Sequence, residues 1–269
     1  MNKVNLKGLT LADYLHPEEE SFRLGADNIF LVRKALDILN DISVQLVRQI
    51  TEGKWVELKP ETAPDILKTV EEVCQTLDFP KRPKIFTRHE RSTKIIVGGT
   101  DYMQMLIPDY VLNEYDADMK RYAFGNAISM FKAGHVQLAN ISSVLFSNSL
   151  TAPMQVALFT YLRAADLTSD RGGLLACQNF SAAARCILVE AGLSLTEMRY
   201  LNDEEILSLA EEYLQEISYG EVGMGDVLTE TAAFWKRIDT DEAPPPVRLK
   251  ELLNWYRDGY EKVLSKRSC

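Results

Sequence analysis

The sequence predicts an α+β protein in which helices make up most of the mass. Apolar residues recur at helical spacing over most of the chain, whereas three short runs typical of strands lie between residues 84 and 108. The 269 residues are 46% hydrophobic and 26% charged, which is enough length and apolar content for a sizeable core. This composition excludes intrinsically disordered, collagen-like and disulfide-scaffold proteins.

The first part of the chain, residues 1–20, is expected to be an irregular lead-in. Residues 21–265 are expected to form a single domain. Apolar periodicity predicts two helices, at 28–52 and 60–77. Strand-forming residues predict three strands, at 84–87, 93–97 and 102–108. Because Gly98-Gly99 is a hairpin signal, we expect these strands to form a small antiparallel β-meander.

From about residue 117 the chain is predicted to be helical almost to its end. The expected helices lie at 117–138, 152–171, 179–192, 203–217, 224–236 and 247–264. The run Ala243-Pro244-Pro245-Pro246 is interpreted as a rigid extended spacer before the last helix, because each proline fixes its own backbone and restrains its neighbour.

Charge and cysteine usage limit the partners and the compartment. The net charge of −9 disfavours phosphate backbones, so we expect no nucleic acid partner. No apolar run follows the N-terminus, and the most apolar stretch, 136–162, carries too many Asn, Gln and Ser residues for a bilayer span of about 20 residues. The four cysteines form no C-x-x-C pair and look reduced. A soluble, cytoplasmic protein is therefore predicted.

Three local patterns follow one another in the second half of the chain. A helix over 119–135 ends in Lys-Ala-Gly-His, and a second segment over 163–177 contains Asp-Arg-Gly-Gly-Leu-Leu. The third pattern, over 244–255, is a proline run followed by Arg-x-x-Glu-Leu. Over about residues 20–260 these patterns resemble the HtpX-type (CAAX-prenyl-protease-like) zinc metallopeptidases.

This resemblance implies a metallopeptidase-like (zincin) helical core. In such enzymes the two histidines of His-Glu-x-x-His share one face of a helix and bind one zinc ion. The intervening Glu acts as general base on the metal-bound water. A Glu from a second helix completes the ligand set and leaves one position open.

The resemblance also implies that the hydrolytic site is degenerate here. Anchored on Gly134 and His135, it assigns Asn126 and Met130 to the two ligand histidines and Ala127 to the general base. Asn is a poor zinc ligand, a Met thioether is soft and neutral, and Ala cannot accept a proton. We therefore expect no catalytic residue and no cofactor, because the ancestral zinc would be lost.

Residual metal-binding candidates are Asp166, at the position of the third ligand, Asp170, His135 and Glu242. These oxygen-rich groups leave open a divergent hydrolase that uses a rebuilt magnesium or manganese site. The structural alternative is that Asp170 and Arg171 fix two core helices as a polar cluster. For His135 the structural alternative is a helix C-terminal residue favoured by the helix dipole.

The resemblance assigns a peptide-binding edge to Thr93, Lys94, Ile95, Ile96 and Val97, because the family's edge strand accepts substrate as an added strand. The favoured function is thus a pseudopeptidase that binds a protein or peptide partner, such as an active relative, or that serves as a regulatory subunit of a heteromeric complex.

Two further alternatives stay open. Ser129 or Cys177 could act as a nucleophile with His135 as base. A small ligand could also bind in a vacated cleft lined by Asn126, Met130 and Asp166.

Overall fold

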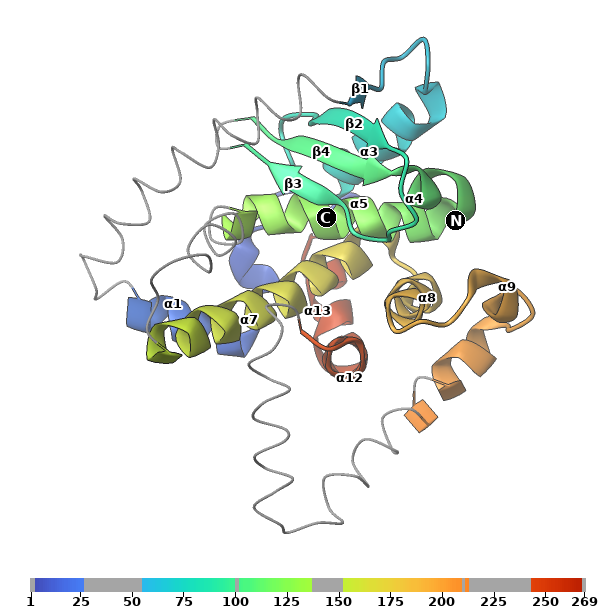
Figure 1. Ribbon diagram of the computed structural model, residues 1–269. Helices are drawn as coiled ribbons and strands as arrows, with labels where there is room; N and C mark the ends of the chain where they lie inside the picture. The colour runs from blue at the N-terminus through green and yellow to red at the C-terminus, as the bar shows by residue number, and fades with distance from the viewer. Residues whose placement is uncertain are drawn as a thin grey trace.

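The computed structural model describes residues 3–26, 55–99, 102–136, 152–209, 211–212 and 243–267. These residues form a mostly helical molecule with one small four-stranded sheet, which confirms the α+β, mostly α, class (Figure 1). The helices predicted at 28–52 and 224–236 lie outside the described residues, and so does Glu242.

Most of the longer described helices follow predicted segments with changes at their ends, whereas the helices at 11–13, 17–26, 109–114 and 195–198 were not predicted. They are η1 (Leu11–Asp13), α1 (Pro17–Ala26), α3 (Pro64–Thr76), α4 (Asp109–Glu114), α5 (Ala117–Lys132), α7 (Ala152–Cys177), α8 (Phe180–Glu190), α9 (Leu195–Met198), α12 (Pro245–Trp255), the π-helical η2 (Tyr256–Tyr260) and α13 (Glu261–Arg267). The chain is also helical over 203–209.

Two differences at helix starts have a simple cause in proline. Residues 17–20, expected to be irregular, belong to α1, which begins at Pro17 and carries three glutamates in its first turn. The proline run is not an extended spacer throughout, because Pro245 and Pro246 occupy the first turn of α12. Proline suits the first turn of a helix, where its missing N–H has no partner in any case.

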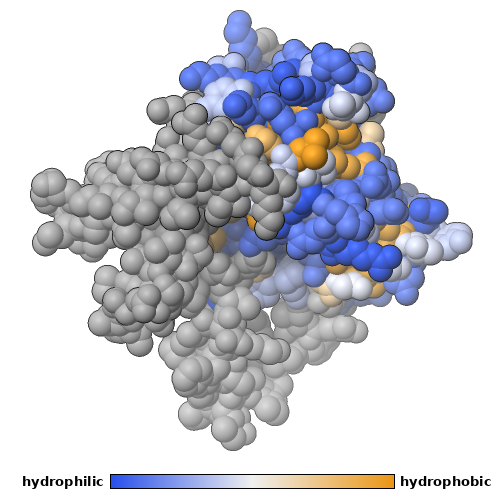
Figure 2. Space-filling model, turned by 45° about the horizontal axis from the view of Figure 1, so that its top comes forward, coloured by the Kyte–Doolittle hydropathy of each residue, from blue (hydrophilic) through white to orange (hydrophobic). Residues whose placement is uncertain are grey.

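The sheet has the strand order β1-β2-β4-β3. The strands are β1 (Val56–Glu57), β2 (Lys84–Arg88), β3 (Ile96–Gly98) and β4 (Gln104–Pro108). β3 and β4 form the predicted antiparallel hairpin, with Val97 opposite Met105. On the face that Figure 2 shows, most of the described surface is hydrophilic and apolar side chains gather in small patches.

The predicted antiparallel meander is wrong, because β2 pairs with β4 in parallel and not with β3. Residues 89–95 cross the end of β4 and carry the chain to its far side. Asp109, at the start of α4, fixes this crossing: it pairs with His89, and its Oδ1 accepts the backbone N–H of Glu90 at 2.9 Å. β3 therefore becomes an edge strand of the sheet.

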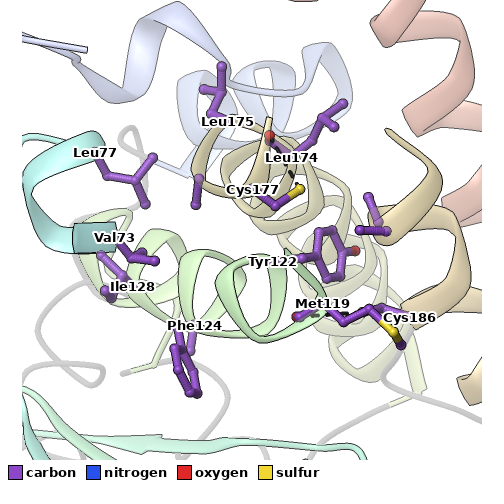
Figure 3. Packing of buried hydrophobic residues seen from close by; sticks show 14 of the residues in the cluster. Val73, Leu77, Met119, Tyr122, Phe124, Ile128, Leu174, Leu175, Cys177 and Cys186 are labelled. Carbon is purple, nitrogen blue, oxygen red and sulfur yellow. Dashed lines mark hydrogen bonds between the residues drawn. The ribbon is translucent and has the colours of Figure 1, made fainter. Parts of the chain in front are cut away.

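The centre of the molecule is the contact between α5 and α7. The sheet lies on one side of α5, and α7 packs against another side (Figure 1). Figure 3 shows Tyr122 and Ile128 of α5 among the core side chains of α7 and α3, with Phe124 pointing toward the sheet. Asp116 fixes the start of α5, because its carboxylate accepts the N–H groups of residues 118 and 119 at 2.9 Å.

Glycines allow α5 and α7 to approach closely. A Cβ atom on Gly125 would lie 2.2 Å from Cβ of Ala176, and one on Gly172 would lie 1.8 Å from Oγ of Ser129. The sequence predicted that the helix starting at residue 152 ends at residue 171, and this predicted end is wrong. α7 continues through Gly172-Gly173 to Cys177, because the close packing against α5 outweighs the low helix propensity of glycine.

We predict that Gly125→Ala destabilises the fold, because the added methyl group overlaps Ala176 and forces the two helices apart. The expected loss is about 1–3 kcal/mol of unfolding free energy, measured by urea denaturation. The control is Gln75→Ala on the exposed side of α3, which should change stability by less than about 0.5 kcal/mol. Equal effects from both substitutions would contradict this account of the helix contact.

Candidate functional site

A cavity of about 770 Å³ opens beside α5, between α7, α8, the start of α12 and the segment that precedes β3. We call it the α5 pocket. Its lining residues are Thr93, Lys94, Ile95, Tyr115, Tyr122, Ala123, Asn126, Ala127, Met130, Asp166, Cys186, Glu190, Ala243, Pro244, Pro245 and Arg248.

The residues that the sequence pattern assigned to a degenerate metal site meet in this pocket. Asn126, Ala127 and Met130 line it from α5, because they are spaced by one and four residues on a helix. Asp166 lines it from α7. Its Oδ2 accepts the backbone N–H of Ala243 at 2.9 Å, which ties the start of the C-terminal segment to α7.

Asp170 lies one turn further along α7 and is buried outside the pocket lining. Arg248 donates to both of its carboxylate oxygens, from Nη2 at 2.7 Å and from Nε at 2.8 Å. Its Oδ1 also accepts from Tyr122 Oη at 2.7 Å and from Asn126 Nδ2 at 2.8 Å. Since both oxygens already accept hydrogen bonds, Asp170 holds helices together and is a poor candidate for binding a cation.

The structural alternative of a polar cluster that fixes core helices agrees with the contacts of Asp170, but Arg171 is not part of this cluster. Arg171 points elsewhere: its Nη1 donates to the carbonyl oxygen of Leu15 at 2.9 Å, and its guanidinium lies 5.3 Å from the ring centre of Trp255. The cation that neutralises Asp170 is Arg248, which also pairs with Glu190. The polar cluster therefore joins α7 to α12 and α8.

Burial and neighbouring charges determine which ionisable side chains of the α5 pocket are charged. Burial alone would lower the pKa of Arg248, but the negative charges of Asp170 and Glu190 raise that pKa well above its ordinary value. Burial also raises the pKa of Tyr122 and of Cys186 well above their usual ranges. At neutral pH the pocket thus presents a guanidinium, a neutral phenol and a neutral thiol, and Cys186 is not an activated nucleophile.

His135 lies in a different place, buried beyond the end of α5. Its Nε2 is 2.7 Å from Oε1 of Glu19, and both side chains are fully buried. Its Nδ1 is 3.4 Å from Oγ of Ser169, and the ring packs edge-on against Tyr161. His135 therefore belongs to a buried polar cluster that joins α1 and α7 to the segment after α5, and it does not line the α5 pocket.

Of the four residual metal candidates, the three that lie within the described residues are not brought together. Asp166 lines the pocket, the carboxylate of Asp170 is occupied, His135 is in the other cluster, and Glu242 lies outside the described residues. Within the described part of the chain, no group of three His, Cys, Asp or Glu side chains has the arrangement of a metal site.

The two nucleophile candidates also lie outside the pocket lining. Ser129 is buried at the contact of α5 with Gly172. Cys177, at the end of α7, is fully buried, which raises the pKa of its thiol to about 12. Neither side chain can reach a ligand in the α5 pocket as an active nucleophile.

The predicted peptide-binding edge borders the pocket. Thr93, Lys94 and Ile95 line it, and the chain then enters β3 at Ile96, whose side chain is 39% exposed. Val97 turns into the core. Among the described residues no strand pairs with the outer edge of β3, so backbone groups on that edge are not used by the sheet.

Arg248, Tyr115 and Glu190 are among the pocket residues to which sequence reasoning assigned no role. Arg248 stands in the Arg-x-x-Glu-Leu pattern, so the pattern could have identified it. Tyr115 and Glu190 carry no comparable signal, because Tyr115, directly after α4, and Glu190, at the end of α8, reach the pocket only through the tertiary fold.

Comparison of the chain with protein-family models, with curated protein sequences and with solved structures finds no match. The resemblance to metallopeptidases therefore stays a prediction from the sequence. None of the helices that the structure describes is both long enough and apolar enough to cross a bilayer.

We predict that Arg248→Ala strongly destabilises the protein, because Asp170 loses its neutralising partner inside the core. The expected loss is about 3–5 kcal/mol of unfolding free energy, measured by urea denaturation. As a control, Arg257→Ala breaks an exposed ion pair with Glu211 and should cost less than about 1 kcal/mol. A small effect from Arg248→Ala would mean that the cluster does not hold the pocket together.

Proposed function

We propose that this protein is a catalytically inactive, metallopeptidase-like protein that binds an extended peptide segment of a partner protein. One observation carries the proposal: the positions that the sequence pattern assigns to the metal site, from two separate helices, line one pocket next to an edge strand. If the sequence resemblance were accidental, there would be no reason for Asn126, Ala127, Met130 and Asp166 to line the same cavity.

The chemistry of these side chains supports binding over hydrolysis. Peptide hydrolysis by a metallopeptidase needs a bound metal ion and a base for the attacking water. Ala127 offers no base, and Met130 with Ala123 makes that wall of the pocket apolar. A rebuilt magnesium or manganese site is the weaker proposal, because the oxygens of Asp170 are engaged by Arg248 and His135 pairs with Glu19.

The edge strand supports an extended peptide as the ligand. A peptide added beside β3 would complete the hydrogen bonding of its outer edge. Thr93 and Ile95 line the pocket, so a side chain of that peptide could enter it from the strand. The apolar wall formed by Ala123, Ala127 and Met130 favours an apolar side chain at this point.

The proposal includes a reducing compartment such as the cytoplasm. Cys74, Cys177 and Cys186 are free thiols and all three are buried. Burial raises the pKa of Cys74 to about 12, so it carries a proton at neutral pH and stays unreactive.

We expect peptide binding to depend on open space in the pocket. Random decapeptides displayed on phage are selected on the purified protein, and an enriched peptide is synthesised for fluorescence anisotropy. Ala123→Phe places a ring in the pocket and should weaken its binding at least tenfold. The matched control is Ala117→Phe on the exposed start of the same helix, which should leave the affinity unchanged. If no peptide is enriched, or if both variants bind it equally, the proposed function is wrong.

We also expect no metal-dependent proteolysis. Purified protein incubated with zinc, manganese or magnesium should leave casein intact, because the pocket lacks a base at Ala127. Cleavage that a chelator abolishes, and that Asp166→Ala removes, would contradict the proposal and favour the rebuilt metal site.

A further inference from the structure

The side-chain amide of Asn126 is held in one orientation at the wall of the α5 pocket. Its Nδ2 donates to Oδ1 of Asp170 at 2.8 Å, and Asp170 lies outside the pocket lining. A carboxylate only accepts hydrogen bonds, so the amide nitrogen must face it and the amide cannot turn over. Tyr122 and Arg248 donate to the same carboxylate oxygen and keep it in place.

This orientation directs the amide oxygen of Asn126 away from Asp170, because the nitrogen and the oxygen of an amide lie on opposite sides of its carbon. Within the described part of the chain no group donates to Asn126 Oδ1, and this oxygen is not one of the fully buried atoms that lack a partner. Because Asn126 lines the α5 pocket, it presents there an accessible acceptor that a ligand can use.

The lining next to this acceptor is apolar. Ala123 and Met130 lie one turn before and one turn after Asn126 on α5, and both line the pocket together with Ala127. Pro244 and Pro245 line it from the start of the C-terminal segment. A Met thioether makes favourable contacts with aromatic rings. The pocket thus combines an apolar wall with one fixed acceptor.

A side chain of the peptide is better placed than its main chain to reach this acceptor. The sheet lies on one side of α5, which carries Asn126 (Figure 1). A peptide strand added beside β3 would lie in the layer of the sheet, with its main-chain N–H groups directed along that layer. Alternate side chains would point toward α5. We therefore look for the donor on a side chain.

The charges in the lining favour an uncharged donor. The described lining carries two cations and two anions, namely Lys94, Arg248, Asp166 and Glu190. Both anions have partners within the protein, since Asp166 accepts the backbone N–H of Ala243 and Glu190 pairs with Arg248. A cationic side chain would lose its hydration here without gaining an unpaired counter-charge.

We propose that the α5 pocket receives a tryptophan side chain of the bound peptide, with the indole N–H donating to Asn126 Oδ1 and the ring packing against the apolar wall. The single polar atom of tryptophan is a donor, and the rest of the side chain is apolar. A tyrosine hydroxyl would also bring lone pairs that need donors. This inference rests on the proposed function and deepens it, since it names the side chain that the peptide carries.

Indole and benzothiophene test the inference without a peptide, because they have the same shape and a sulfur atom replaces the N–H. Their binding to ¹⁵N-labelled protein is followed by NMR chemical shifts. We expect indole to bind about three- to tenfold more tightly than benzothiophene, and Asn126→Ala to remove this preference. Equal binding of the two compounds, or tighter binding of n-butylguanidinium than of indole, would overturn the inference.

The matched control for Asn126→Ala is Tyr122→Phe. Each substitution removes one donor from the same oxygen of Asp170, but Tyr122→Phe leaves Asn126 in place. The preference for indole should therefore persist in Tyr122→Phe. Its loss in both variants would assign the effect to the polar cluster around Asp170 and would overturn the inference.

The selected decapeptide gives a second test on the unaltered protein. We expect tryptophan to be enriched at one position, and its replacement by benzothienylalanine to weaken binding about three- to tenfold. If peptides are enriched without tryptophan, or if the replacement has no effect, the inference fails and the proposed function stands. If indole is preferred as expected but no decapeptide is enriched, the proposed function fails and the indole site stands.

Discussion

The bidentate bond between Arg248 and Asp170 is the interaction on which the pocket depends. Arg248 stands on α12 and Asp170 on α7, and the same carboxylate also accepts from Tyr122 and Asn126 on α5. Glu190 brings α8 to the other side of the guanidinium. One buried carboxylate and one guanidinium therefore connect all four helices that surround the cavity, and without the cation the carboxylate would be buried unpaired.

This use of charge also determines what the pocket can do. The oxygens of Asp170 accept the hydrogen bonds that hold the helices together, and the side-chain amide of Asn126 donates one of them. Polar groups that could have taken part in catalysis thus stabilise the packing of the helices, whereas Ala127 and Met130 form an apolar wall of the pocket. The cavity is therefore suited to holding a side chain next to the edge strand β3 and poorly suited to activating water.

The sequence allowed the helices around the site to be predicted, because α5, α7 and α8 are long runs of mostly apolar, helix-forming residues that need no distant partner to be recognised. The β3–β4 hairpin was also predictable from Gly98-Gly99. The parallel pairing of β2 with β4 was not, since it depends on Asp109 holding a crossing segment that is remote in sequence. For the same reason the burial of His135 against Glu19 was missed: it requires α1, which the sequence pattern did not predict.

The most direct test of the central claim is the metal content of the purified protein. The protein is incubated with zinc, manganese and magnesium, desalted, and analysed by mass spectrometry for bound metal. An inactive binding protein with this pocket should retain far less than one equivalent of any of the three. Retention of one equivalent that disappears in Asp166→Ala would contradict the account, because it would mean that a metal site has been rebuilt in the pocket.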